Sequence, residues 1–263
     1  MQSNNTFDIT RFGILWRQNL THNYKLVLTS LAGFCGALFI LLLLIQIGEG
    51  FHPLHTGHYF ELLIVVFIAT GIICSGTSFT NLRAREKMHN YLMLPASAFE
   101  KFLMEFIGRI LLFILIVPLF YWAVFNLEGY LVHLFYPSYP FQSFPLFANP
   151  HFHFGTDLAN NRMNAFMITG GLLIFIIPFT GATIFNKNPL IKTLFAVAII
   201  FFFNLFLVYF FIEILEFKDY YPDSSILFMR GLEDSILALI IGSMIFNIAL
   251  IMAAYFKLKE REV

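Results

Sequence analysis

Six windows of this chain contain no Asp, Glu, Lys, Arg or His and consist mostly of apolar residues. They run over residues 26–48, 62–82, 110–127, 163–186, 193–212 and 235–256. A helix needs roughly 20 such residues to cross the hydrocarbon core of a bilayer. We extend the third window back to Phe102, which gives a span near 102–127. The sequence therefore predicts an all-α, polytopic membrane protein with six transmembrane helices in a single domain over residues 1–263.

The composition indicates that lipid is the natural solvent of this chain. Hydrophobic residues make up 59% of it and charged residues only 12%, and 35 of the 263 residues are phenylalanine. A soluble domain of this size could not hide so much apolar surface. The formal net charge is zero, so electrostatics give no reason to expect a nucleic-acid partner. Cys35 and Cys74 both lie in apolar windows, so no disulfide framework is expected.

The basic residues predict the orientation of the spans, because Lys and Arg collect on the cytoplasmic side of membrane proteins. With six spans, both termini lie on the same side. Of the 16 Lys and Arg residues, all fall on that side except Arg162, Lys218 and Arg230. We therefore expect cytoplasmic N- and C-termini and a cytoplasmic segment 83–101.

Two segments outside the spans have patterns of their own. Apolar residues recur at near-helical spacing in residues 1–24, which predicts an interfacial helix on the cytoplasmic leaflet, with a simple anchoring flank as the alternative. These apolar residues are Ile9, Phe12, Leu15, Trp16 and Leu20. Residues 128–162 predict an aromatic loop at the outer surface. Four prolines and three histidines lie between positions 129 and 156, and proline breaks helices at high cost in lipid.

Motifs for several kinds of chemistry are absent from the sequence. There is no G-x-x-x-x-G-K-[ST] motif for nucleotide hydrolysis, and no H-E-x-x-H or G-x-S-x-G motif for proteolysis. No ionisable residue occupies the centre of a predicted span, whereas ion-coupled transporters usually carry intramembrane acids or histidines. We therefore expect no enzymatic activity and no cofactor, and we expect the energy for any transport to come from another subunit.

Three histidines form an H-x-x-H-x-x-H pattern in the first outer loop: His52, His55 and His58. Imidazole is the commonest metal ligand in proteins. A proline and a glycine in the same short loop argue against a shared helical face, and no cysteine or carboxylate cluster completes a site. We treat them as weak metal candidates and expect solvated histidines by default.

Segment 83–101 has the strongest local pattern outside the spans. The apolar residues Tyr91 to Leu94 are followed by Pro95, which disfavours helix at the residue before it. Ser97 is a predicted N-cap, and Glu100 three residues later completes a capping box in front of the third span. The segment is therefore predicted to be a helix, an apolar elbow and a new helix. The alternative is a basic cytoplasmic loop that ends in a helix cap.

These residues resemble the permease subunits of type-2 ATP-binding-cassette exporters, which have six spans, cytoplasmic termini and a coupling helix between spans two and three. The resemblance rests on Arg85-Glu86-Lys87, on the Leu94-Pro95 turn with the small residues after it, and on Glu100-Lys101. It implies that a cytoplasmic ATPase binds this elbow. The implied contact residues are Glu86, Leu94, Pro95, Ala96, Ser97, Phe99, Glu100 and Lys101, with a smaller contact at Lys187 and Asn188.

The same resemblance implies a bacterial inner-membrane protein that works as a homodimer, or as a heterodimer with a related permease. The chain departs from the family in two respects. Met88-His89-Asn90 follow the acidic-basic pair, where the family often has a glycine, and the large outer loop lies between spans three and four rather than between five and six. Few charges and many aromatic residues in the spans suit an amphipathic or lipid-like substrate.

Two other functions remain open at this point. A non-transporting scaffold or assembly factor would act through the outer aromatic loop 129–156. A membrane enzyme ranks third, because only the outer histidines could supply its chemistry.

Overall fold

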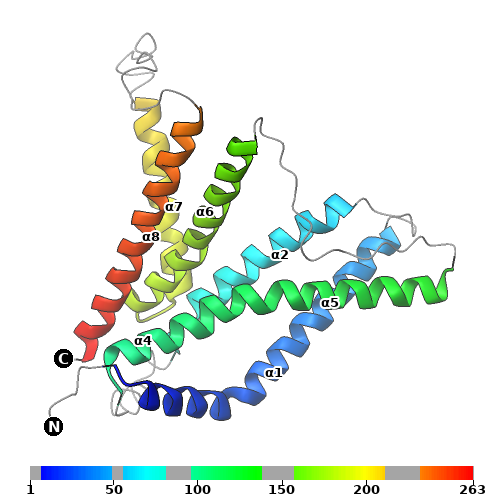
Figure 1. Ribbon diagram of the computed structural model, residues 1–263, viewed down its shortest axis with the longest axis horizontal. Helices are drawn as coiled ribbons and strands as arrows, with labels where there is room; N and C mark the ends of the chain where they lie inside the picture. Colours follow the sequence, from blue (N-terminus) through cyan, green and yellow to red (C-terminus); the bar gives the residue numbers. More distant parts are fainter. Residues whose placement is uncertain (1–6, 49–55, 81–95, 138–156, 211–231, 263) are drawn as a thin grey trace. The chain divides into compact units, whose positions relative to one another are not determined.

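Every regular element that the structure describes is a helix, so the all-α prediction is confirmed (Figure 1). The computed structural model describes residues 7–48, 56–80, 96–137, 157–210 and 232–262. The elements are α1 (Ile9–Gly48), α2 (Thr56–Gly76), α4 (Ala98–Phe106), the π-helical turn η2 (Ile107–Leu111), α5 (Leu112–Phe135), α6 (Asp157–Ile184), α7 (Pro189–Tyr209) and α8 (Leu232–Glu262).

Five of the described helical stretches are long and apolar enough to cross a membrane: Ile9–Gly48, Ala98–Phe135, Asn161–Ile184, Pro189–Leu207 and Ile236–Arg261. The second of these runs through α4, η2 and α5 without a break. A shorter apolar stretch, Phe60–Gly76, lies in α2. The chain is therefore a multi-pass membrane protein.

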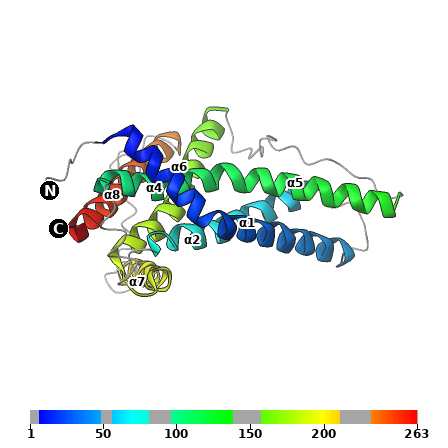
Figure 2. The ribbon, with the colours of Figure 1, turned by 90° about the horizontal axis from the view of Figure 1, so that it is seen from below.

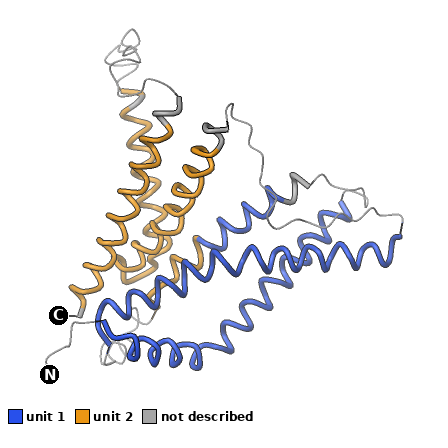
Figure 3. The backbone as a smooth tube through the Cα atoms, viewed as in Figure 1, with its two compact units in different colours: residues 1–71, 95–150 blue, residues 72–94, 151–263 orange. Residues whose placement is uncertain are grey.

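The chain divides into two compact units (Figure 3). Unit 1 contains residues 1–71 and 95–150, and unit 2 contains residues 72–94 and 151–263. Unit 1 thus holds α1, most of α2, and the α4–η2–α5 helix. Unit 2 holds the end of α2 together with α6, α7 and α8.

In unit 1, α1 and the α4–η2–α5 helix run side by side in the same direction (Figures 1 and 2). Arg11 meets Glu100 near the start of both helices, and Gln46 meets Glu128 near their ends. Between these contacts lies an apolar cluster whose residues recur at helical spacing on each helix. It comprises Leu38, Leu42, Tyr121, Val124 and Phe125, with Phe60, Leu62, Leu63 and Val66 of α2 packed against it.

In unit 2, α6 and α8 also run in the same direction and pack closely along their length. The Asn247 side-chain amide donates to the Thr169 carbonyl oxygen at 3.0 Å, and Arg261 donates to the carbonyl oxygen of Ile184 at 3.1 Å, so the contacts advance together along both helices. Helix α7 lies between α6 and α8 in the sequence and follows α6 after a short connection at residues 185–188.

The start of the chain differs from the prediction of a separate interfacial helix over residues 1–24. Ile9–Gly48 form one continuous helix, because no proline interrupts the backbone between the predicted interfacial segment and the first span. The ribbon of α1 changes direction after its first few turns (Figure 1). The predicted apolar stripe is partly turned towards the protein, since Leu15 is buried. Residues 1–6 lie outside the described part of the chain.

The second helix ends earlier than the predicted span 62–82. Helix α2 stops at Gly76, and Phe79 adopts a left-handed backbone with φ of 55°. The sequence Ser-Gly-Thr-Ser after Cys74 has low helix propensity, which favours this early end. Phe79 is almost fully buried against Phe179, with ring centroids 5.2 Å apart, and this contact holds the turn in place.

The third helix is longer than the predicted span 102–127, and it shortens the predicted outer loop 128–162. It begins at Ala98 and continues to Phe135, and α6 begins at Asp157. The prediction ended the span at Glu128 because that residue is charged. In the fold, this side chain is buried against α1 rather than placed in a loop. Residues 138–156 lie outside the described part.

The last three predicted spans agree with the described helices to within a few residues at most ends. Span 163–186 corresponds to α6, span 193–212 to α7, and span 235–256 lies wholly within α8. Residues 211 and 212 lie outside the described part. Proline 178 stays inside a continuous α6.

Candidate functional site

The capping box predicted in front of the third span is confirmed. Ser97 has an extended backbone, with φ of −69° and ψ of 155°, and begins helix α4. Its hydroxyl oxygen accepts from the backbone N–H of Glu100 at 3.2 Å, and its own N–H donates to Glu100 Oε2 at 2.8 Å. The two bonds fix the direction in which the chain enters the helix.

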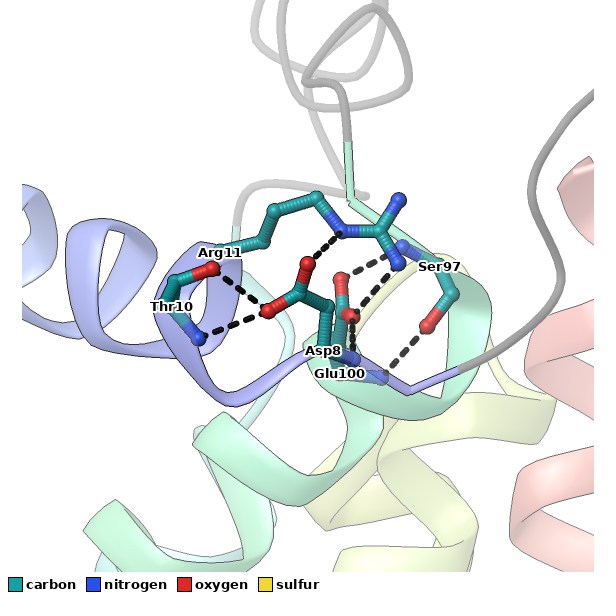
Figure 4. Close-up of polar contacts among 5 residues, drawn as sticks. All are labelled: Asp8, Thr10, Arg11, Ser97 and Glu100. Atoms are coloured by element: carbon teal, nitrogen blue, oxygen red, sulfur yellow. Dashed lines mark hydrogen bonds and ion pairs between the residues drawn. The ribbon is translucent and has the colours of Figure 1, made fainter.

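Glu100 also ties this turn to the start of α1 (Figure 4). Its Oε1 atom accepts from the backbone N–H of Asp8 at 2.9 Å and from Arg11 Nη2 at 3.1 Å. The Glu100 side chain is fully buried, so these charge-assisted bonds are poorly screened by water. One carboxylate therefore joins two segments that lie about ninety residues apart in the chain.

Asp8 caps the first turn of α1. Its carboxylate accepts from both the hydroxyl and the backbone N–H of Thr10, and Arg11 Nε lies 3.9 Å away. The Thr10 hydroxyl, helped by the backbone bond, holds the pKa of the Asp8 carboxyl below its usual value. Asp8 therefore stays ionised at neutral pH and keeps both its cap and its position beside Arg11.

An aromatic pair lies next to this polar cluster. The rings of Phe7 and Phe99 meet edge to face, with centroids 5.9 Å apart. Phe7 also packs on Phe12 at 5.9 Å, which is a hydrophobic staple: the residue before the N-cap packs on the fourth helical residue. Phe7 remains 46% exposed and Phe99 41% exposed. A rigid turn thus presents two aromatic rings at the protein surface.

The predicted docking residues separate into exposed and buried groups. Glu86, Leu94 and Pro95 lie outside the described residues. Ala96 and Ser97 are half-buried, and Phe99 is exposed. Glu100 and Lys101 are buried, Lys101 to 2% exposure. Glu100 is occupied by internal contacts, so within residues 96–101 the large side chain open to a partner is Phe99.

The second predicted contact lies in unit 2. Lys187 and Asn188 are both exposed, in the connection between α6 and α7. Asn188 has a left-handed backbone, with φ of 49°, and Pro189 follows it at the first position of α7. A proline there is favourable because its fixed φ suits the first helical turn.

The weak metal candidates lie largely outside what the structure describes. His52 and His55 are in the undescribed residues, and His58 is in α2 but its side chain is not described. Within the described ranges there is no group of three or more His, Cys, Asp or Glu side chains able to hold a metal ion.

Phe7, Asp8 and Thr10 were not singled out as site residues from the sequence. The local signal for them existed: an aspartate N-cap at position 8, with phenylalanine just before it and again four residues after it. The long-range bond from Arg11 to Glu100 had no comparable signal, because nothing in a single sequence pairs those two charges.

No protein-family model, curated protein or solved structure matches this chain. The role of the site therefore has to be argued from its own geometry. That geometry is a capped and tethered helix start with exposed aromatic side chains beside it.

Replacing Ser97 with alanine is expected to lower the free energy of unfolding by about 1 kcal/mol, because the amide of Glu100 loses its side-chain acceptor. Unfolding in detergent, followed by circular dichroism, measures the change. Ser30→Ala is the matched control, since the Ser30 hydroxyl bonds only within its own exposed helical turn. Equal stabilities for the two variants would show that the cap contributes nothing.

Proposed function

We propose that this chain is the membrane-spanning permease subunit of an ABC-type exporter. A separate cytoplasmic ATPase docks on the elbow at residues 83–101 and drives transport of an amphipathic or lipid-like substrate. Two copies of the chain, or one copy and a related permease, form the pathway in the bacterial inner membrane. The observation that carries this proposal is the tethered turn at Ser97–Glu100 with Phe99 exposed on it.

The geometry of the Ser97–Glu100 turn supports the proposal. An element that couples two subunits needs a rigid base, meaning a firm attachment to its own subunit, and an accessible tip, meaning a side chain that the other subunit can contact. Glu100 supplies the base through its bonds to Ser97, Asp8 and Arg11. Phe99 supplies an apolar tip, and burying such a ring in a partner groove stabilises a complex by roughly 1.5–3 kcal/mol. The exposed Phe7–Phe99 pair beside this polar cluster also favours a binding role, because exposed apolar patches mark interaction sites.

The helix directions support six spans. Because α1 and α5 run in the same direction, the chain between them has to return across the same thickness, and α2 is the described helix in that return. Its 21 residues are roughly 32 Å long at about 1.5 Å per residue. The apolar stretch Phe60–Gly76 accounts for roughly 25 Å of this length, against a core of about 30 Å. The same argument makes α7 the return between α6 and α8. With three crossings in each unit, as we propose, both termini lie on one side, and the basic residues favour the cytoplasm for that side.

Phe99→Asp is expected to abolish co-purification of the ATPase while the membrane subunit stays folded. A charge at the centre of an apolar contact should weaken binding about 30-fold or more. The tagged protein is extracted from its native membranes in mild detergent, and the bound proteins are identified by mass spectrometry.

Ile9→Asp is the control, because Ile9 is 74% exposed in the first turn of α1 but is not part of the elbow. Recovery of a nucleotide-binding ATPase with wild type and Ile9→Asp, and its loss with Phe99→Asp, supports the proposal. Equal recovery with all three proteins refutes the elbow as the docking site. If no ATPase is recovered with wild type, the exporter proposal fails.

A further inference from the structure

Unit 1 contains a buried carboxyl group far from the elbow. The Glu128 side chain on α5 is fully buried, and it accepts from Gln46 Nε2 on α1 at 3.2 Å. Its other oxygen, Oε1, is also buried and has no hydrogen-bond partner among the described residues. Gln46 itself is only 2% exposed. A carboxyl group in this place has one neutral donor and no counter-charge in the described part of the chain.

The side chains buried along the same stretch of α1 and α5 are mostly apolar. Leu42 of α1, with Phe125 and Val132 of α5, is buried along the same stretch of the two helices, and α2 packs on the adjacent cluster with apolar side chains. Of the described titratable side chains of α5 and α2, Tyr121 is buried in that cluster, and Glu61, Tyr130 and His133 are exposed. The sequence that follows Gln46 carries Glu49, His52, His55 and His58, whose side chains lie outside the described part.

An ionised carboxylate in such a place is costly. Moving an unpaired charge out of water costs several kcal/mol even after the protein relaxes, and one bond from a neutral amide does not offset that cost. A neutral carboxylic acid avoids it. An acid and a primary amide can also exchange two hydrogen bonds, N–H to acid oxygen and O–H to amide oxygen.

We propose that Glu128 is a proton-binding site whose protonated form joins the far ends of α1 and α5 through Gln46. Binding is simple uptake of a proton by the carboxylate, with no further reactant. This site is separate from the docking elbow, and it does not depend on the proposed exporter function.

The position of Glu128 links proton binding to a movement of α1 relative to α5. It lies 28 residues after Glu100 on one continuous helical stretch, roughly 42 Å away at about 1.5 Å per residue. The hydrocarbon core is about 30 Å thick, so a helix that starts at one surface brings Glu128 close to the opposite one. If α1 and α5 separate there, water reaches the carboxyl and the proton leaves. Proton release and opening of this end are then reciprocally linked.

The test uses purified protein in lipid nanodiscs, comparing wild type with Glu128→Gln. Glutamine has the shape of the neutral acid and cannot ionise. We expect an infrared band from a protonated carboxyl in wild type near neutral pH that is missing from Glu128→Gln, and equal stability of the two proteins only below about pH 4, where the unfolded glutamate is protonated as well. Above the pKa of an unfolded glutamate, about 4.3, the unfolded chain releases this proton while the folded protein keeps it. The folding equilibrium of wild type should therefore fall about tenfold per pH unit relative to the variant, until the folded site releases its proton and the difference becomes constant.

Glu61→Gln is the matched control, because it removes an exposed glutamate from the same unit and should leave the band intact. Absence of any band that depends on Glu128 between about pH 5 and about pH 9 would overturn the proposal. So would a Glu128→Gln variant that cannot fold, since folding would then require the ionised form. Stabilisation by Na⁺ that depends on Glu128, without a carboxyl band, would assign the site to a cation instead.

Discussion

Replacing Glu100 with alanine should lower the free energy of unfolding by about 3 kcal/mol, close to the cost of breaking a buried ion pair. The variant removes the acceptor of three N–H donors at once: those of Ser97, Asp8 and Arg11. Bonds to charged groups contribute about 1.5–3 kcal/mol each but do not add fully. Chemical unfolding in detergent, monitored by circular dichroism and by the fluorescence of Trp16, measures the loss.

Glu260→Ala is the matched control for this experiment. Glu260 pairs with Lys257 at 2.7 Å on the exposed last turns of α8, and surface pairs contribute about 0–1 kcal/mol. The Lys257–Glu260 pair is the shorter of the two ion pairs, but its loss should lower the free energy of unfolding less, because water screens it. If Glu100→Ala costs no more than Glu260→Ala, the tether between the elbow and α1 is not a stabilising contact.

Replacing Gly181 with alanine should lower the free energy of unfolding by a similar amount, about 3 kcal/mol. A methyl group on Gly181 would overlap the hydroxyl of Thr193 on α7 and lie 2.7 Å from its Cβ and Cγ2 atoms. Thr193 is nearly fully buried and its hydroxyl donates to the Pro189 carbonyl oxygen at 2.7 Å, so it has little room to move. Helices α6 and α7 would have to separate, and thermal unfolding in nanodiscs reports the cost.

Gly170→Ala is the matched control for Gly181→Ala, because a methyl group at Gly170 meets nothing within 4 Å. In a helix interior, alanine is favoured over glycine by roughly 0.5–1 kcal/mol. The same substitution in one helix should thus destabilise at Gly181 and stabilise at Gly170. Two changes of the same sign would contradict the close approach of α6 and α7.

The features predicted correctly from sequence are those with a local physical cause. Runs of uncharged apolar residues located the long helices, because each backbone polar group in lipid has to be satisfied within its own helix. The Ser97–Glu100 capping box followed from a three-residue spacing and is present as expected. Both sequence patterns are contained within a few helical turns, so they can be recognised without knowing any distant contact.

The features that were missed depend on contacts between distant residues. Glu128 was used to end a span, yet it is buried between α5 and α1, where Gln46, 82 residues earlier, donates to it. Glu100 was expected to face a partner, but Arg11 and the Asp8 backbone occupy its carboxylate. In each case the ionisable residue was identified from the sequence, and its partner was not visible from one sequence.

The continuity of α1 has a consequence for its length in the bilayer. Its 40 residues make a helix roughly 60 Å long at about 1.5 Å per residue, whereas a whole bilayer with its headgroups is about 40–45 Å thick. At least roughly 15 Å, about ten residues, therefore has to lie outside the membrane or along its surface. With no loop between the two parts, one helix carries the Arg11 tether near its start and packs Leu38 into the apolar cluster of unit 1 further along. A displacement of the first turns of α1 is therefore passed to its membrane part through a hydrogen-bonded helical backbone rather than through a loop.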